Sequence, residues 1–196
     1  EADFMAPEDN LYRVGAASIL SAGYHTYKAL AHVYTSEVDC TECTDGGLVW
    51  GESAFGTIRE AVESGAARVL VHPGRYPQTF YLVSGVEVIG AGAETTIIEP
   101  PSGAPSTLVT ADGVVGVSLA RLTLAGTTGW NGFLAEGETT GVRLTRNIFR
   151  HLNTAISLTG GSGVEILNNT IVENINGISI TDVVDDGTSV IVRNTI

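Results

Sequence analysis

Apolar and polar residues alternate along the second half of this chain, and asparagines interrupt the alternation at regular places. In GVEILNNTIVENINGISI, residues 163–180, two adjacent asparagines stand in the middle of such a pattern. Alternation with a period of two is typical of a half-buried β-strand. Asparagine is depleted in strands, so Asn169, which lies between Ile166 and Ile171, needs a structural reason.

The same pattern occurs four times, at offsets of 25, 22 and 25 residues. The copies read VSLARLTL, VRLTRNIF, VEILNNTI and SVIVRNTI, and they begin at Val117, Val142, Val164 and Ser189. Strand periodicity that repeats at this interval without a helix predicts a β-solenoid. In this alignment the apolar columns are Leu119, Leu144, Ile166 and Ile191, then Leu124, Phe149, Ile171 and Ile196, and, before each strand, Leu108, Phe133, Ile156 and Ile178.

One polar column lies between the apolar columns of the repeat. It reads Leu122, Asn147, Asn169 and Asn194. Equivalent positions of successive coils stack about 4.8 Å apart, so amide side chains can hydrogen-bond to one another and to the turn backbone. We expect Asn147, Asn169 and Asn194 to form a buried structural ladder. An asparagine-lined substrate site is the functional alternative, although buried polar groups are usually satisfied within the fold.

The first half of the chain predicts a helix followed by strands. Ser53 can cap the start of the helix and Gly65 its end. RVLV, a Pro-Gly turn, GVEVIG and TTII follow and read as strands and turns. The apolar face of the helix consists of Phe55, Ile58, Ala61 and Val62.

These residues resemble the opening of the pectin lyase-like, right-handed parallel β-helix proteins, which include pectin methylesterases and bacterial surface proteins. The resemblance covers residues 44–196 and implies an all-β, right-handed parallel β-helix with a short N-terminal capping helix. Asp45-Gly46, Trp50 and Ala54-Phe55 are more similar to the surface proteins than to the esterases. The motifs are Phe55-x-Thr57-Ile58-x-x-Ala61-Val62, Val69-x-Val71-x-x-Gly74-x-Tyr76, Val86-x-Val88-x-Gly90-x-Gly92 and Thr96-Ile97-Ile98.

Residues 1–35 resemble the closing segment of such β-helices, although they stand at the beginning of this chain. We therefore expect three parts: this segment, an entry strand with the C-x-x-C loop and capping helix over 36–67, and coils over 68–196. The last repeat leaves an open strand edge, with Ile191 and Ile196 at an open apolar core, which is a template for another chain. We expect the N-terminal segment of one copy to pack head to tail on the last coil of another, burying Phe4, Leu11 and Val14, either between successive units of one tandem array or between separate subunits. The alternative is that it folds back along its own coils.

Charge excludes some classes of partner. The 196-residue chain has 22 acidic and 10 basic residues and a net charge of −12, which argues against nucleic acid and anionic membrane surfaces. No apolar run is long enough to span a bilayer, so we expect no membrane insertion.

The two cysteines, Cys40 and Cys43, form a single C-x-x-C motif. A local disulfide in an extracellular or cell-surface protein is the favoured interpretation. Zinc would need two further ligands, and the upstream pair His25 and His32 is more widely spaced than usual zinc-binding histidines. Redox chemistry would need a strand–helix context that the flanking residues do not supply.

Catalytic residues of the related enzymes have no counterpart here. The coils GVRLTRNIFRHL and GVEILNNTIVEN contain no Asp, and Gln78 is the only Gln. His72 is interpreted as a turn residue, and His151 has no carboxylate nearby in the sequence that would make it a base. We expect a non-catalytic structural module of a surface protein, adhesin or filament. The alternative is a pectate lyase-like, pectin esterase-like or polysaccharide-binding β-helix whose active coils lie beyond this chain.

Two polar groups are weaker candidates for binding. The loop TDVVDDGT could hold calcium, although six to eight oxygen ligands are needed, and a solvated loop is the alternative; no other cofactor is expected. Three arginines just before the ladder column could bind an acidic polysaccharide or an acidic partner surface, or they could fold back onto turn carbonyls. The calcium candidates are Asp182, Asp185 and Asp186, and the arginines are Arg121, Arg146 and Arg193.

Overall fold

The computed structural model describes residues 30–45, 47–103, 106–127, 129–182 and 190–196. The contacts expected of Phe4, Leu11 and Val14 lie outside the described residues, and so do Asp185 and Asp186.

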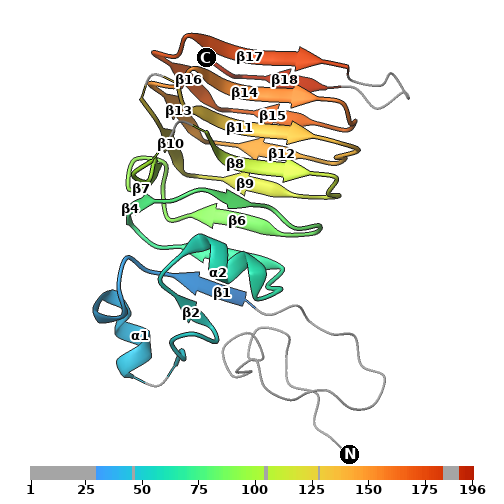
Figure 1. Ribbon diagram of the computed structural model, residues 1–196. Coiled ribbons are helices and arrows are strands. Elements are labelled where there is room, and N and C mark those ends of the chain that lie inside the picture. Colours follow the sequence, from blue (N-terminus) through green and yellow to red (C-terminus); the bar gives the residue numbers. More distant parts are fainter. Residues whose placement is uncertain (1–29, 46, 104–105, 128, 183–189) are drawn as a thin grey trace, which may run out of the picture.

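The described chain is a parallel β-solenoid of about six turns, in which strands stack in three sheets (Figure 1). The first sheet, in spatial order, contains β18 (Ile191–Arg193), β15 (Glu165–Leu167), β12 (Arg143–Thr145), β9 (Ser118–Ala120), β6 (Glu87–Gly90), β3 (Arg68–Val71), β1 (Leu30–Val33) and β2 (Ala54–Phe55). The second contains β16 (Thr170–Val172), β13 (Ile148–Arg150), β10 (Thr123–Ala125), β7 (Thr96–Glu99) and β4 (Gly74–Pro77). The third contains β17 (Asn176–Thr181), β14 (Thr154–Thr159), β11 (Asn131–Glu136), β8 (Thr107–Asp112) and β5 (Phe80–Tyr81).

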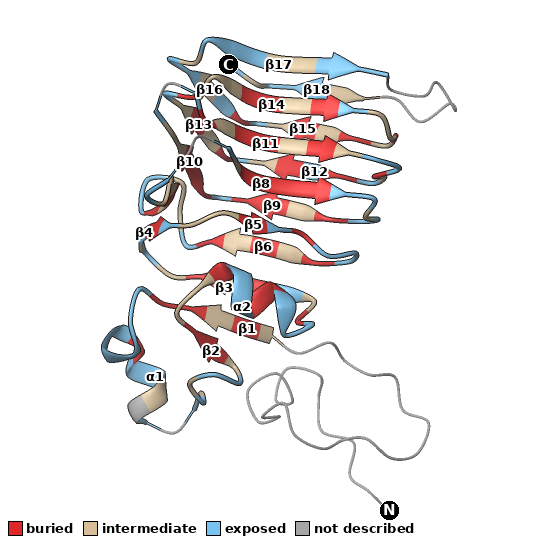
Figure 2. Cartoon of the chain, in the orientation of Figure 1, coloured by how far each residue is buried: buried red, intermediate tan, exposed pale blue. Residues whose placement is uncertain are grey.

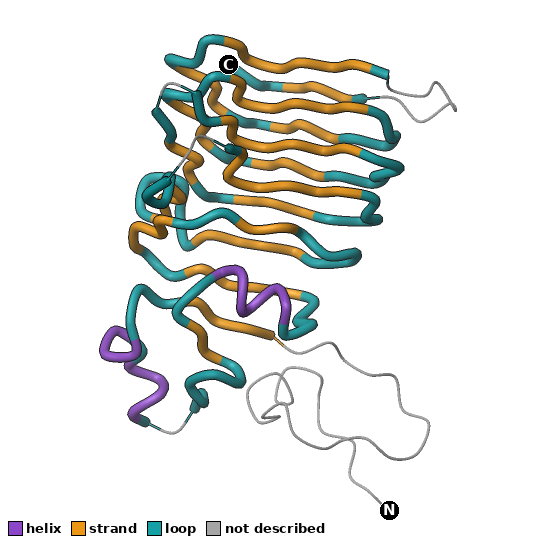
Figure 3. The backbone as a smooth tube through the Cα atoms, in the orientation of Figure 1, coloured by secondary structure: helices purple, strands orange, loops and turns teal. Residues whose placement is uncertain are grey.

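Strands make up 47% of the structure, which confirms the prediction of an all-β parallel β-helix. The described helices all precede β3 (Figure 3): η1 (Glu37–Asp39), α1 (Thr41–Thr44) and α2 (Ile58–Glu63). The core of the coils consists of buried apolar residues, and the red segments of Figure 2 mark where buried residues lie along the chain. Burial of these columns is the main force that holds such short strands together.

The helix α2 begins later than the sequence indicated. Thr57 is its N-cap, and the Thr57 hydroxyl accepts a hydrogen bond from the Glu60 N–H at 3.1 Å. The predicted cap, Ser53, is wrong because it belongs to the turn before β2: its hydroxyl accepts from the Val49 N–H, and Phe55 lies in β2 rather than in the helix. The expected end is correct, since the Gly65 N–H donates to the Val62 carbonyl and Gly65 has a φ of 82°.

The predicted register of the last coil is wrong by one residue. Ile166 pairs with Val192, and Ile191 pairs with Glu165 at an outward position. Ile196 is 90% exposed, and its N–H donates to the Asn169 carbonyl. The physical reason is that Val190, Ile191 and Val192 are all apolar, so hydropathy alone fits either register. The partly buried Val190 packs against the core in place of the expected residues.

The apolar column expected before each strand (Leu108, Phe133, Ile156 and Ile178) is also misaligned by one residue, at its first member. Phe133 pairs with Val109 rather than with Leu108, while the later pairing of Phe133 with Ile156 agrees with the alignment. Leu108 and Val109 are both fully buried, so their apolar character did not distinguish them.

The first sheet starts before Arg68. Strand β1 pairs with β3, so that Leu30 lies opposite Arg68, and β2 pairs with the other edge of β1. The end of the N-terminal segment therefore belongs to the sheet of its own chain. Helix α2 contacts β1, β2, β3 and β5 at this end of the solenoid.

Candidate functional site

The buried asparagines join successive coils through side chain to backbone hydrogen bonds. Asn169 is 1% exposed, its Oδ1 accepts from the Asn147 N–H at 2.9 Å, and its Nδ2 donates to the Leu144 carbonyl at 2.8 Å. Asn147 repeats this geometry one coil earlier, with the Leu122 N–H at 3.3 Å and the Leu119 carbonyl at 2.8 Å. Each amide thus satisfies two backbone groups of the preceding coil, which agrees with the expected bonds to backbone and differs from the expected bonds between stacked amides.

The third expected ladder residue, Asn194, lies elsewhere because of the shifted register. Thr195 occupies the position above Asn169, and its hydroxyl donates to the Ile166 carbonyl at 3.4 Å. Asn194 is exposed and has a φ of 49°. It therefore belongs to the turn column that precedes the ladder.

A further asparagine that joins two coils was not predicted. Asn174 Oδ1 accepts from the Leu152 N–H at 2.9 Å, and Asn174 Nδ2 donates to the Phe149 carbonyl at 2.9 Å. The geometry matches that of Asn169, at another corner of the coil. The sequence carried a weak signal, since Asn174 follows Asn169 by five residues, but no earlier coil has asparagine there.

The arginine column is smaller than expected. The residue before each ladder position has a φ between 49° and 59°, and the column reads Arg121, Arg146, Asn168 and Asn194. Arg121 Nη2 donates to the Ala91 carbonyl at 2.7 Å, so this side chain folds back onto the backbone. Arg146 is exposed, whereas Arg193 lies in β18 opposite Leu167 and does not join the column.

Outward charges form ion pairs between neighbouring coils. Arg143 Nε lies 2.7 Å from Glu165 Oε2, and Arg68 Nε lies 2.8 Å from Glu87 Oε2. Exposed pairs of this kind contribute about 0–1 kcal/mol each, so they help the register more than the stability.

The expected calcium loop is only partly described. Asp182 follows β17 with a φ of 53° and takes the place that Gly160 holds one coil earlier, since Thr181 pairs with Thr159. Aspartate tolerates this left-handed backbone better than most residues, which accounts for its presence at this turn. Among the described residues, no group of three or more His, Cys, Asp and Glu side chains could hold a metal ion.

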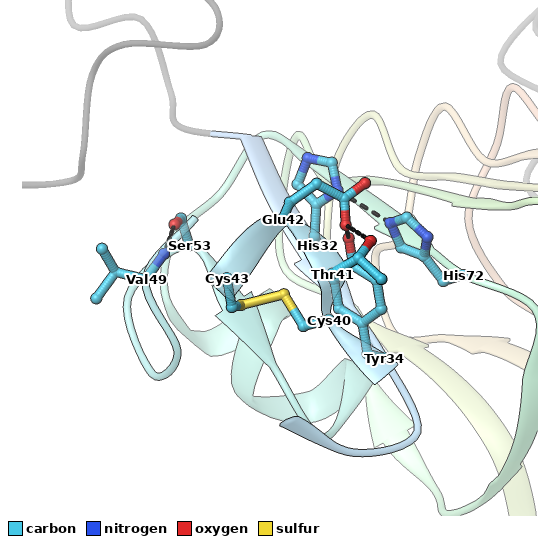
Figure 4. The surroundings of a disulfide bond; sticks show 9 residues. All are labelled: His32, Tyr34, Cys40, Thr41, Glu42, Cys43, Val49, Ser53 and His72. Atoms are coloured by element: carbon cyan, nitrogen blue, oxygen red, sulfur yellow. Dashed lines mark hydrogen bonds between the residues drawn. A yellow bond between two sulfur atoms is a disulfide. The ribbon is translucent and has the colours of Figure 1, made fainter. Parts of the chain in front are cut away.

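The most unusual cluster of side chains lies beside the disulfide (Figure 4). Cys40 and Cys43 are bonded, so neither thiol is available as a metal ligand. His32 Nδ1 lies 3.0 Å from His72 Nε2, and the Tyr34 ring stacks on His72 with centroids 3.9 Å apart. The Tyr34 hydroxyl donates to Glu42 Oε2 at 2.7 Å.

Burial and these contacts change the acid–base properties of the cluster. Burial lowers the pKa of His32 and of His72, and for His32 the neighbouring imidazole adds to this effect, while Glu42 opposes it at both. Burial, followed by the bond to Glu42, raises the pKa of Tyr34 far above its ordinary value. The Tyr34 bond in turn lowers the pKa of Glu42. At neutral pH the imidazoles are therefore neutral, the phenol is protonated and the carboxylate is ionised.

Sequence reasoning missed this cluster. His32 and His72 are 40 residues apart and are brought together only by the pairing of β1 with β3. His72, interpreted as a turn residue, is half-buried and contacts both His32 and Tyr34.

The last described rung has an open edge. Strands β16, β17 and β18 are each the final strand of their sheet. Ile180 is 46% exposed, whereas its partner one rung below, Leu158, is fully buried; Val192 is 45% exposed above the fully buried Ile166. Positions that are core in the lower rungs are thus accessible here, as the pale blue of β17 in Figure 2 illustrates.

Fold and site together define a parallel β-solenoid with one buried asparagine ladder and an open terminal rung. No family model matches the chain, and no match to it was found among curated proteins or solved structures. Within the described part of the chain, no helix is long and apolar enough to cross a membrane.

Proposed function

We propose that this chain is a non-catalytic structural β-helix module of an extracellular surface protein, adhesin or filament, and that copies assemble head to tail. The proposal includes right-handed coils of the pectin lyase-like type, which the sequence motifs and the general preference for right-handed crossovers support. The disulfide between Cys40 and Cys43 supports an oxidising, extracellular location.

The observation that carries the proposal is the exposed apolar edge of the last rung. Ile180 and Val192 occupy columns that are fully buried one rung below, at Leu158 and Ile166. An unpaired strand edge with partly exposed core residues is a template for pairing with another chain. Strand addition there would pair backbone groups and bury the two side chains further.

The proposed occupant of this edge is the N-terminal segment of a second copy. This segment resembles a closing segment in sequence, and Phe4, Leu11 and Val14 are the apolar residues that it would bury. Because β1 pairs with β3 in its own chain, the proposed contact with a neighbour is restricted to residues before Leu30. Such a contact joins two different surfaces and does not close on itself, so it produces a filament.

Deletion of residues 1–20 tests the occupant. We expect the intact chain to form linear polymers in light scattering and electron microscopy, and the shortened chain to remain monomeric. Polymers of the same form from the shortened chain, or an intact chain that stays monomeric at high concentration, would contradict the proposal.

A substitution in the edge strand β18 tests the second surface of the proposed joint. Val192→Lys places a charge in the exposed core column of β18 and should reduce polymer length at least tenfold at equal protein concentration. Val38→Lys is the matched control, because Val38 is 90% exposed in η1. This helix follows β1, which many strands separate from β18 in the first sheet. Equal polymerisation of both variants would show that β18 is not the joint.

A further inference from the structure

The outer face of the first sheet brings two histidines into direct contact. His32 lies in β1, and His72 directly follows β3. The backbone N–H of His72 donates to the Val33 carbonyl at 2.9 Å. The two ring nitrogens, His32 Nδ1 and His72 Nε2, are 3.0 Å apart, so one ring must donate and the other accept. Only one proton fits between these nitrogens, so full protonation of both rings would break the hydrogen bond and place two positive charges in contact.

The segment 37–44 covers this pair. Cys40, at the start of α1, is fully buried and packs with Tyr34 and Ala54, and the partly buried Trp50 contacts the same group. Glu42, in α1, accepts the Tyr34 hydroxyl hydrogen. Tyr34 therefore links the disulfide-closed segment to the ring of His72, on which it stacks.

The charged and titratable groups around the pair come from several elements. Tyr76 of β4 donates to the His72 carbonyl at 2.8 Å, and Arg121, from the turn after β9, bonds to the Ala91 carbonyl one rung further. The remaining groups are Tyr34 beside His32, Glu42 of α1 and Asp39 of η1, whose carboxylate accepts from Thr35 and from Ser36. One carboxylate, Glu42, thus interacts electrostatically with both imidazoles.

We propose that the His32–His72 pair is a proton-sensitive latch, which holds the disulfide-closed segment 37–44 on the first sheet at neutral pH and releases it in mild acid. A proton rather than a metal is assigned to the pair because the described residues offer no third ligand. The latch does not rest on the proposed head-to-tail assembly, since it is argued from contacts within a single chain and its test measures protection of the segment rather than polymer formation.

The direction of the pH effect follows from the histidine pKa values. Burial, the largest cause, lowers the pKa of both imidazoles in the closed state, so the released state binds protons first. The closed state is fully favoured above about pH 6.5, the ordinary histidine value, and loses stability as the pH falls toward the lowered values. The lowered pKa values of Glu42 and Asp39 act in the same direction at lower pH, because their stabilisation is lost on protonation.

Hydrogen exchange tests the latch on the full chain. After correction for the intrinsic effect of pH, amides of residues 37–52 should lose at least tenfold in protection between pH 7.5 and pH 5.5, while amides of β11 and β14 should not. The double variant His32→Gln, His72→Gln should show equal protection at both pH values. His151→Gln is the matched control, because His151 is an exposed histidine that pairs with Glu173, and it should behave as the wild type.

A second measurement keeps the test valid if the double variant folds poorly. In a Trp130→Phe background, the emission of Trp50 should change with pH in step with two of the four histidine ring signals in NMR. Unchanged wild-type protection at pH 5.5, an equal loss of protection in a folded double variant, or histidine titration without any change at Trp50 would each overturn the latch.

Discussion

Single residues decide how the coils of this solenoid are held in register. Each buried asparagine bonds to two backbone groups of the preceding coil, and the residue before it adopts a left-handed backbone, as at Arg146 before Asn147 and Asn168 before Asn169. A buried amide with all its bonds made stabilises, whereas an unpaired backbone N–H costs free energy. These hydrogen bonds hold the asparagine side chain against the backbone of the preceding coil and so fix the register between the two coils.

Replacement of Asn169 tests this interpretation. Asn169→Ala removes the acceptor for the Asn147 N–H and the donor to the Leu144 carbonyl, both buried, and should lower the free energy of unfolding by about 2–4 kcal/mol in urea denaturation. Asn153→Ala is the control, since Asn153 is half-buried and makes one side-chain bond, to Asn131 at 3.3 Å. Equal losses for the two variants would refute the structural role of Asn169.

At the scale of elements, three-residue strands such as β12 and β15 exist only because they stack on one another. Isolated strands of this length are unstable, so each coil depends on its neighbours. The helix α2 differs, because its start is fixed locally by Thr57 and Glu60, which bond to each other through both backbone and side chain. The Thr57 hydroxyl accepts from the Glu60 N–H and donates to the Glu60 carboxylate, so the pair is a variant of the capping box in which the carboxylate bonds to the hydroxyl rather than to the backbone N–H of the N-cap residue.

Removal of the cap should therefore have a modest and local effect. Thr57→Ala should destabilise the protein by about 1 kcal/mol and increase hydrogen exchange in residues 58–66. Glu63→Ala, an exposed change in the same helix, should alter the stability by less than about 0.5 kcal/mol. A Thr57→Ala protein as stable as the Glu63→Ala protein would show that α2 is held by packing alone.

At the scale of the whole molecule, the two ends of the solenoid differ. One end carries α1, α2 and the disulfide, and the other ends in an open rung with Ile180 and Val192 partly exposed. A rod with two different ends suits head-to-tail assembly, which is the proposed function.

The proposed structural role also implies an outcome in enzyme assays. The purified chain should neither cleave nor de-esterify pectin or polygalacturonate, with or without Ca²⁺, in assays of reducing ends, unsaturated products and methanol release. Reproducible turnover that disappears in Asp182→Asn, Asp185→Asn or Asp186→Asn would overturn this expectation. Retention of a trace activity in all three variants would instead point to a contaminating enzyme.

The sequence alone determined the class of fold and the positions of two ladder residues. The repeat spacing, the alternation around Ile166 and the asparagines at 147 and 169 are local features, and a solenoid stacks each coil on its neighbour in sequence order. For this reason a pattern read along the chain translates directly into contacts between coils.

Tertiary structure decided what the local pattern left ambiguous. Val192 rather than Ile191 stands opposite the core residue Ile166, because the register depends on which backbone groups of β15 are paired and not on hydropathy. The His32–His72 contact, with Tyr34 and Glu42 beside it, joins residues from β1, α1 and the turn after β3. No periodicity encodes that contact, since it arises only when β1 enters the sheet next to β3 and Cys40 of the disulfide packs against Tyr34.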